Sequence, residues 1–287
     1  MKAIIYLIAM ICSTTLFAQP TLVKQGHRGC RGYLPENTIM AMKKALDLGV
    51  QVLELDVVIS KDNKVVVSHD PYFASAISLQ PNGDTIAVED EMKYNLYTMN
   101  YAEIRKYDVG SKHNQRFPKQ QNSPCFKPLL SELIDAVEEY ARSKGIRAPY
   151  YNIEIKSKVD WDDKFHPKPK EFVELVIDVC KTRSIMRRMN IQSFDIRPLK
   201  LLHWQYPSIA LSYLTGNEKS ISENLQSLGF TPNFYSPYYK TVDANMVNYC
   251  HENGMKIIPW TVNTRAEIDA LILLKVDGII TDYPDLF

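Results

Sequence analysis

The chain has 287 residues and a formal net charge of +1, with 45% hydrophobic and 23% charged residues. This length suits one large domain or two ordinary ones, and the composition is that of a globular protein able to bury a full core. Because the net charge is close to zero, no global feature points to nucleic acid or to an anionic membrane as a partner. Any affinity for anions must therefore be local.

The first residues, MKAIIYLIAMICSTTLFAQP, differ in character from the rest of the chain. Lys2 precedes an apolar run from Ala3 to Cys12, and a short polar break leads to Ala18. This pattern predicts a secretory signal peptide over residues 1–18, which is too short to remain as a stable membrane anchor. The mature protein, 19–287, would then be exported, as a periplasmic or secreted protein.

The cysteines give no sign of a metal or redox site. Four remain after the predicted cleavage, and none forms a C-x-x-C pair. An exported compartment permits disulfides, but their connectivity does not follow from spacing. We expect unpaired, partly buried thiols at Cys30, Cys125, Cys180 and Cys250.

The front of the chain predicts a strand, a helix and a longer strand, at residues 21–29, 36–49 and 50–60. The next segment, VVISKDNKVVVSHD, has two β-rich arms around Asp62-Asn63 and predicts a β-hairpin. With Asp62-Asn63 as a two-residue turn, Asp56 would lie directly opposite His69.

Residues from about 71 to 126 are rich in Pro, Gly, Asn and Tyr and show little periodicity. A long irregular segment inside a compact domain usually has a function, as a lid or a small insertion. We expect this segment to be an insertion that follows the hairpin of the second strand.

From residue 127 onward, short apolar runs alternate with amphipathic helical patterns. The six apolar runs are 150–157, 189–195, 208–216, 232–239, 255–264 and 277–284. Strand and helix in alternation predict parallel strands with helical crossovers. With the two strands near the front, the count is eight, so we expect a single α/β domain with the closed (β/α)₈ architecture of a TIM barrel.

Functional residues of such a barrel gather where its strands end. Glu54 and Asp56 lie two apart in one strand, so both side chains leave the same face, and Glu154 and Lys156 repeat this spacing in the next strand. Carboxylates inside apolar strands are costly unless paired or bound to a metal. The three acids predict a site for one divalent cation, Mg²⁺ or Ca²⁺.

Histidines complete the predicted site. His27 and Arg28 end the first strand, and the hairpin returns His69 to the same rim. A metal, two histidines and the cations Arg28 and Lys156 suit an anionic phosphoryl group, because the cations stabilise its charge while the histidines move protons. A single His or Glu in a strand is more often structural, and we expect surface or packing roles for His113, His166, His203 and His251.

Six sequence blocks in register resemble the signatures of the glycerophosphodiester phosphodiesterase family, in its bacterial, exported form. They are GHRG with PENT, ELDV, SHDP, IEIK, PWTVN and GIITDYP, and they cover nearly the whole mature chain. The resemblance implies a TIM barrel with a small insertion. It also implies a general acid–base pair, His27 and His69, and the metal ligands Glu54, Asp56 and Glu154. The implied substrate-binding residues are Arg28, Lys156, Glu36 and Trp260.

The implied reaction is the metal-dependent hydrolysis of a small glycerophosphodiester to sn-glycerol 3-phosphate and an alcohol. Two alternatives stay open at this point. A barrel of the same type could act on another phosphodiester, such as a phosphoinositol, lysophospholipid or sphingolipid head group, or the chain could be a non-catalytic exported binding protein. The sequence does not assign the acid and the base between the histidines, nor the oligomeric state.

Overall fold

Eight parallel strands form the centre of the computed structural model, which describes residues 22–287. Their order around the sheet is β8-β7-β6-β5-β4-β2-β1-β9. Their bounds are β1 Val23–Gly26, β2 Val52–Ile59, β4 Tyr150–Ile155, β5 Met189–Ser193, β6 Ala210–Thr215, β7 Phe234–Pro237, β8 Lys256–Ile257 and β9 Gly278–Thr281. The predicted signal peptide, 1–18, lies outside the described residues, so export stays a prediction.

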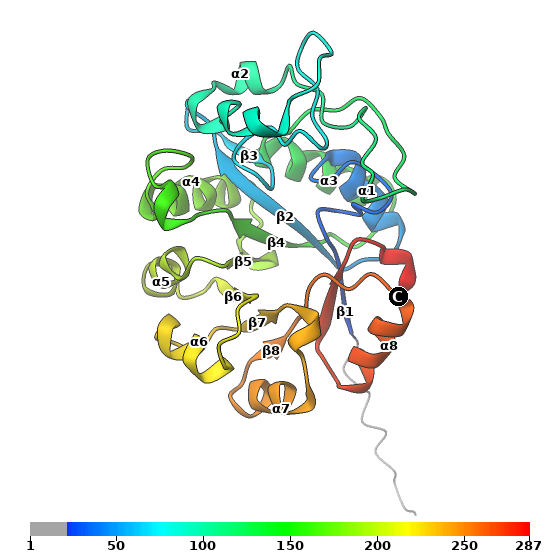
Figure 1. Cartoon of the computed structure of the whole chain (residues 1–287). Coiled ribbons are helices and arrows are strands. Elements are labelled where there is room, and N and C mark those ends of the chain that lie inside the picture. The colour runs from blue at the N-terminus through cyan, green and yellow to red at the C-terminus, as the bar shows by residue number, and fades with distance from the viewer. Residues whose placement is uncertain (1–21) are drawn as a thin grey trace, which may run out of the picture.

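Backbone hydrogen bonds join the two ends of this sheet. The N–H of Asp277 donates to the carbonyl of Ile257 at 3.0 Å, and the N–H of Ile280 donates to the carbonyl of Pro259 at 3.0 Å. The segment that follows β8 therefore runs beside β9 and brings the strands into a ring (Figure 1). The predicted (β/α)₈ barrel is confirmed.

Seven α-helices lie outside the ring of strands (Figure 1). They are α1 Ile39–Asp47, α3 Leu130–Ser143, α4 Pro169–Thr182, α5 Ile196–Gln205, α6 Ile221–Leu228, α7 Ala244–Glu252 and α8 Arg265–Leu273. Single-turn 3₁₀-helices add η3 Val159–Trp161, η4 Met186–Arg188, η5 Tyr239–Thr241 and η6 Pro284–Leu286. In the part of the chain that the structure describes, none of the helices combines the length and the hydropathy needed to cross a membrane.

The first helix, α1, begins at Ile39, directly after a turn and a cap. Asn37 has a positive φ of 57°, so the Pro-Glu-Asn segment forms a turn and not the first helical residues. Thr38 is the N-cap, because its side-chain oxygen accepts a hydrogen bond from the N–H of Ala41 at 3.2 Å. This turn leaves the Asn37 side chain free to contact β2.

The β-hairpin forms, but its predicted register is wrong by one residue. β3, Val65–Val67, runs antiparallel to β2 with Val57 opposite Val67. The N–H of Ser60 donates to the carbonyl of Lys64 at 3.0 Å, which leaves a three-residue loop whose last residue, Asn63, has a φ of 57°. Three-residue hairpin loops with a left-handed residue are a common alternative to the two-residue turn. Asp56 consequently faces Ser68 and not His69, since its carbonyl accepts from the N–H of Ser68 at 3.0 Å.

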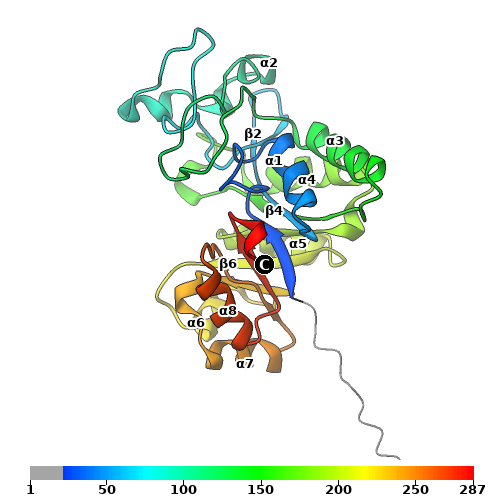
Figure 2. The ribbon, with the colours of Figure 1, turned by 90° about the vertical axis from the view of Figure 1, so that its right-hand side faces the viewer.

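The segment between β3 and α3 packs on the outside of this hairpin and has a small hydrophobic core of its own. It contains η1 Val88–Lys93, η2 Leu96–Thr98 and the short helix α2 Tyr101–Ile104. Its core is formed by Val58 and Val66 of the hairpin together with Phe73, Ile86, Leu96, Ile104 and Val109. Figure 2 shows this insertion as a layer at one end of the barrel. The insertion is therefore anchored on the strand that carries Glu54 and Asp56.

Polar side chains fill part of the barrel interior. Asn152 donates from Nδ2 to Gln25 Oε1 at 2.9 Å and to Gln192 Oε1 at 3.0 Å, and Asn190 Nδ2 donates to Asn152 Oδ1 at 2.6 Å. These residues are buried, so the network is held away from water. It ends on a carboxylate, because Gln192 Nε2 donates to Glu54 Oε1 at 2.7 Å. The network therefore helps to fix the position of the Glu54 carboxylate.

The four cysteines among the described residues form no disulfide, as expected. Cys30, Cys180 and Cys250 are buried, and Cys125 is partly buried. Burial raises the pKa of the Cys180 thiol to about 12, which keeps it protonated and unreactive.

Candidate active site

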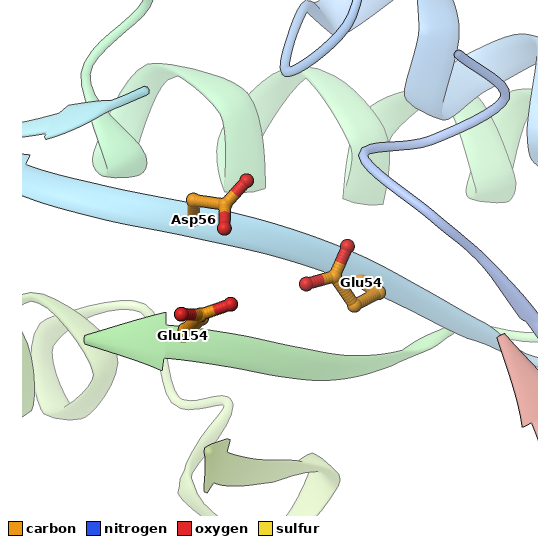
Figure 3. A group of neighbouring side chains, drawn as sticks. All are labelled: Glu54, Asp56 and Glu154. Atoms are coloured by element: carbon orange, nitrogen blue, oxygen red, sulfur yellow. The ribbon is translucent and has the colours of Figure 1, made fainter. Parts of the chain in front are cut away.

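Three carboxylates converge where β2 and β4 lie side by side. The pleat of β2 directs Glu54 and Asp56 to the same face, and the parallel register places Glu154 of β4 beside Asp56. Figure 3 shows the three side chains pointing toward one another. One oxygen from each lies within 4.8 Å of the other two, and all three residues are buried. The structure brings the three predicted metal ligands together.

The hydrogen bonds of this cluster leave one buried oxygen without a partner. Glu54 Oε2 accepts from the N–H of Arg28 at 2.8 Å, and Asp56 Oδ2 accepts from Asn37 Nδ2 at 2.8 Å. Among the described residues, Asp56 Oδ1 is buried and accepts no hydrogen bond. Leaving such an acceptor unmatched costs free energy. An all-oxygen set with a free, inward-facing lone pair fits a hard divalent cation, Mg²⁺ or Ca²⁺.

The pKa values of the cluster support the same conclusion. Burial, and then the negative charges of Asp56 and Glu154, raise the pKa of Glu54 well above its ordinary value. Burial also raises the pKa of Glu154, against the opposing charge of Lys156. For Asp56, burial acts in the same direction, but Arg28 leads a group of cations that holds the pKa below its usual range. The cluster does not hold three negative charges comfortably without added positive charge.

Two cations, Arg28 and Lys156, lie beside the carboxylates. Arg28 donates from Nη1 to Glu36 Oε1 at 2.7 Å, and its Nε lies 3.2 Å from Asp56 Oδ2. Lys156 donates from Nζ to Glu154 Oε1 at 2.8 Å, and the same nitrogen lies 3.8 Å from Asp56 Oδ1. Glu36 thus braces Arg28, and Glu154 holds Lys156 in the same way.

His27 is fixed by a buried carboxylate at the end of the last strand. Its Nδ1 lies 2.7 Å from Asp282 Oδ1, and Asp282 is 1% exposed. Asp282 also accepts from Arg31 Nε at 2.9 Å and from Asn263 Nδ2 at 2.7 Å. The His27 Nε2 atom lies on the other side of the ring, 3.9 Å from Glu54 Oε2. Burial, and then the charge of Arg31, lower the pKa of His27 to about 4, so the ring is neutral at neutral pH.

His69 has a more open setting just after β3. Its Nδ1 lies 3.0 Å from Asp70 Oδ1, and both side chains are 31% exposed. Ser68 fixes the backbone on either side of His69. Its Oγ donates to the carbonyl of Asp70 at 2.6 Å and accepts from the buried Lys127 Nζ at 2.8 Å. The cavity therefore has a second His–Asp pair.

One cavity of about 750 Å³ connects these groups. Eight of the nine predicted site residues line it: His27, Arg28, Glu36, Glu54, His69, Glu154, Lys156 and Trp260. The ninth, Asp56, is not part of the lining and is fully buried beside Glu54 and Glu154. The insertion contributes part of the wall, through Ala74, Ala76, Ile77, Asn114, Arg116 and Phe117.

Aromatic rings from three strand ends form another part of the wall. Trp260 packs edge-on against Phe194 with ring centroids 5.3 Å apart, and Tyr238 lies 5.8 Å from Trp260. Trp260 Nε1 donates to the carbonyl of Ser236 at 2.9 Å, which fixes the indole. These rings offer an apolar surface to the carbon skeleton of a substrate.

The sequence analysis assigned no role at the site to Asp282, Arg31, Asn37 or Gln192. Asp282 had a detectable signal, since it belongs to the GIITDYP block and directly follows β9. The other three support carboxylates through contacts that only the fold reveals. The remaining histidines have packing or surface positions, as expected: His166 is buried, His203 stacks on Phe230 at 4.0 Å, and His113 and His251 are exposed.

Comparison with known proteins identifies the family of this chain. Residues 27–286 match the model of the Glycerophosphoryl diester phosphodiesterase family. The chain belongs to this family. The expected family and enzyme class are confirmed.

Individual relatives span nearly the full chain. A glycerophosphodiester phosphodiesterase from Caldanaerobacter subterraneus subsp. tengcongensis is 31% identical over 90% of this chain and 93% of its own. A putative glycerophosphoryl diester phosphodiesterase structure from Silicibacter pomeroyi is 31% identical, with a TM-score of 0.83 over 93% of this chain and 92% of that one. A phosphodiesterase from Oleispira antarctica, in complex with the product sn-glycerol-3-phosphate, shares the fold with a TM-score of 0.71 at 23% identity, covering 91% and 93% of the two chains.

Proposed function

We propose that this cavity hydrolyses small glycerophosphodiesters to sn-glycerol 3-phosphate and an alcohol, with one Mg²⁺ or Ca²⁺ held by Glu54, Asp56 and Glu154. The observation that carries the proposal is the buried Oδ1 of Asp56, which accepts no hydrogen bond from the described residues, within a cluster of three carboxylates. Two histidines and two cations surround that cluster in a single cavity. The relatives named as glycerophosphodiester phosphodiesterases support the substrate class.

When bound, the cation would act as a Lewis acid that stabilises negative charge on the phosphoryl oxygens. The chain itself supplies the remaining positive charge. Arg28 and Lys156 would orient the phosphate, and each is already held by a carboxylate, Glu36 or Glu154. A cation that is fixed before the substrate arrives stabilises developing charge without reorganisation.

The two histidines suit opposite proton transfers. His27 is neutral at neutral pH and has Nδ1 engaged with Asp282, so its Nε2 lone pair would take the proton of the attacking hydroxyl. His69 would donate a proton to the departing alcohol oxygen. With water as the nucleophile, one P–O bond forms to its oxygen and the P–O bond to the alcohol breaks. With the internal glycerol hydroxyl as the nucleophile, the alcohol leaves as a cyclic phosphate forms, and water then opens that ring, so one water is consumed overall on either route.

The test is a substrate panel after EDTA treatment, with each divalent ion added back singly. We expect turnover of glycerophosphocholine and glycerophosphoethanolamine, and recovery with Mg²⁺ or Ca²⁺. His27→Ala and His69→Ala should each lower kcat/KM by roughly 10²–10⁴-fold, since a general acid or base contributes about that much. Glu54→Gln should abolish the response to added metal.

His251→Ala is the matched control. His251 also pairs with an aspartate, at 3.0 Å from Asp277 Oδ2, but it does not line the cavity. Its loss should leave turnover unchanged. If either of the cavity histidines proves dispensable, its proposed role is wrong. Turnover of intact lysophospholipid vesicles without turnover of the small diesters would replace the proposed substrate class, and no turnover of any phosphodiester would favour a binding protein.

A further inference from the structure

Phe117 of the insertion packs against Arg31 on the His27 side of the cavity. Phe117 is 5% exposed, and its ring centroid lies 4.7 Å from the guanidinium carbon of Arg31. Arg31 is buried as well, and it donates to both oxygens of Asp282, from Nε at 2.9 Å and from Nη2 at 3.1 Å. A guanidinium that stacks on a ring and engages both oxygens of one carboxylate is held in one orientation.

The same part of the insertion also fixes the backbone that carries Arg31. Gln120 Nε2 donates to the carbonyl of Arg31 at 2.7 Å and to that of Leu34 at 3.1 Å. The N–H of Gln121 donates to the carbonyl of Tyr33 at 2.8 Å. Both the side chain and the main chain of Arg31 are therefore positioned by residues 117–121.

Arg31 is the side chain that donates to both oxygens of Asp282. This carboxylate is buried, and its only other side-chain partners among the described residues are His27 and Asn263. Without Arg31, both oxygens of Asp282 would lose a charged donor, which leaves His27 on Oδ1 and Asn263 on Oδ2, and the carboxylate would be held less firmly. The hydrogen bond to His27 Nδ1 would then no longer be fixed in direction.

We propose that Arg31, seated against Phe117 of the insertion, is a positioning residue for the hydrolysis: it fixes Asp282, and through Asp282 the ring of His27. The inference rests on the proposed proton transfer by His27. The insertion thereby contributes to the rate of the chemical step as well as to the wall of the cavity.

Steady-state kinetics of the full-length, metal-loaded protein tests this proposal. Arg31→Gln should lower kcat by roughly 10–100-fold, the usual cost of losing a residue that orients a ligand or catalytic group, with KM changed by less than about threefold. Arg31→Lys should recover part of kcat, because one donor and the charge remain. Phe117→Leu keeps an apolar contact but loses the flat face, so kcat should fall only a few-fold.

Arg105→Gln is the matched control. Arg105 also stacks on an aromatic ring, at 4.2 Å from the centroid of Phe126, and pairs with Glu132, but it lies outside the cavity. Its loss should leave kcat and KM unchanged. An increase in KM at constant kcat in Arg31→Gln would show that Arg31 binds substrate directly, and would overturn the proposal.

A second measurement covers the case in which Arg31→Gln folds poorly. Nitrogen-15 NMR of labelled histidine in Arg31→Lys reports which ring nitrogen of His27 carries the proton. We expect the Nδ1–H signal of the native enzyme to shift or broaden in that variant, and an unchanged signal would contradict the proposal. The two hypotheses also fail separately. Full turnover in His27→Ala would refute the role of His27, whereas an inactive His27→Ala with a normal kcat in Arg31→Gln would refute only the role of Arg31.

Discussion

The two His–Asp pairs of the cavity differ in how firmly the fold holds them. On the barrel side, His27 has a side chain that is 12% exposed, and the side chain of its partner Asp282 is 1% exposed. On the hairpin side, the side chains of His69 and Asp70 are both 31% exposed. The pair His27–Asp282 is thus buried, whereas the pair His69–Asp70 is partly open to solvent.

This difference follows from where each pair comes in the chain. His27 and Asp282 follow β1 and β9, two strands that are paired along their whole length. His69 lies beyond the end of β3, a three-residue strand, and is adjacent in sequence to its own partner. A base that must stay neutral and aligned benefits from burial, while a group that must exchange protons with water after each turnover benefits from access.

The largest effect that tests this comparison is expected for Asp282. Asp282→Asn should lower kcat/KM by roughly 100-fold, because the amide no longer enforces the Nδ1–H tautomer of His27. Asp70→Asn should lower it only a few-fold, since water can replace a half-exposed partner. Parallel kinetics of the two variants under the same metal load measures this ratio. Equal losses would show that burial does not distinguish the two pairs.

Much of the site was predictable because chemistry and spacing are local. Glu54 and Asp56 share a face by the pleat of one strand, and an acid inside an apolar strand stands out in any sequence. The order of strands and helices followed from alternating patterns in the same way. These features need no knowledge of distant contacts.

The features that the sequence did not predict depend on particular backbone angles or on contacts between residues far apart in the chain. The hairpin register depends on Asn63, whose left-handed conformation lengthens the loop by one residue. Its effect on His69 was small, because β3 ends at Val67, before the histidine. The contact between Arg31 and Asp282 joins residues 251 positions apart, and only barrel closure brings them together.

Metal binding should affect stability, and this effect too separates the barrel side from the hairpin side. Burial raises the pKa of Glu54 and of Glu154 above the ordinary 4.5. The contribution of these two groups to the free energy of unfolding is therefore fully present below pH 4.5 and is lost as the pH rises through their raised pKa values. The metal-free protein is consequently less stable at neutral pH than it would be with both groups protonated. A cation that binds the ionised cluster removes that loss of stability.

Thermal unfolding with and without Ca²⁺ or Mg²⁺ measures this contribution. At about 100 times Kd, the cation should stabilise the fold by about 3 kcal/mol, which raises Tm by roughly 5 °C. The gain should shrink as the pH is lowered toward 5, because protons compete for Glu54 and Glu154. Asp70→Asn, on the open side of the cavity, should keep the full gain, and Glu54→Gln should lose most of it. A gain that does not change with pH, or that survives in Glu54→Gln, would show that the cation binds away from the buried carboxylates.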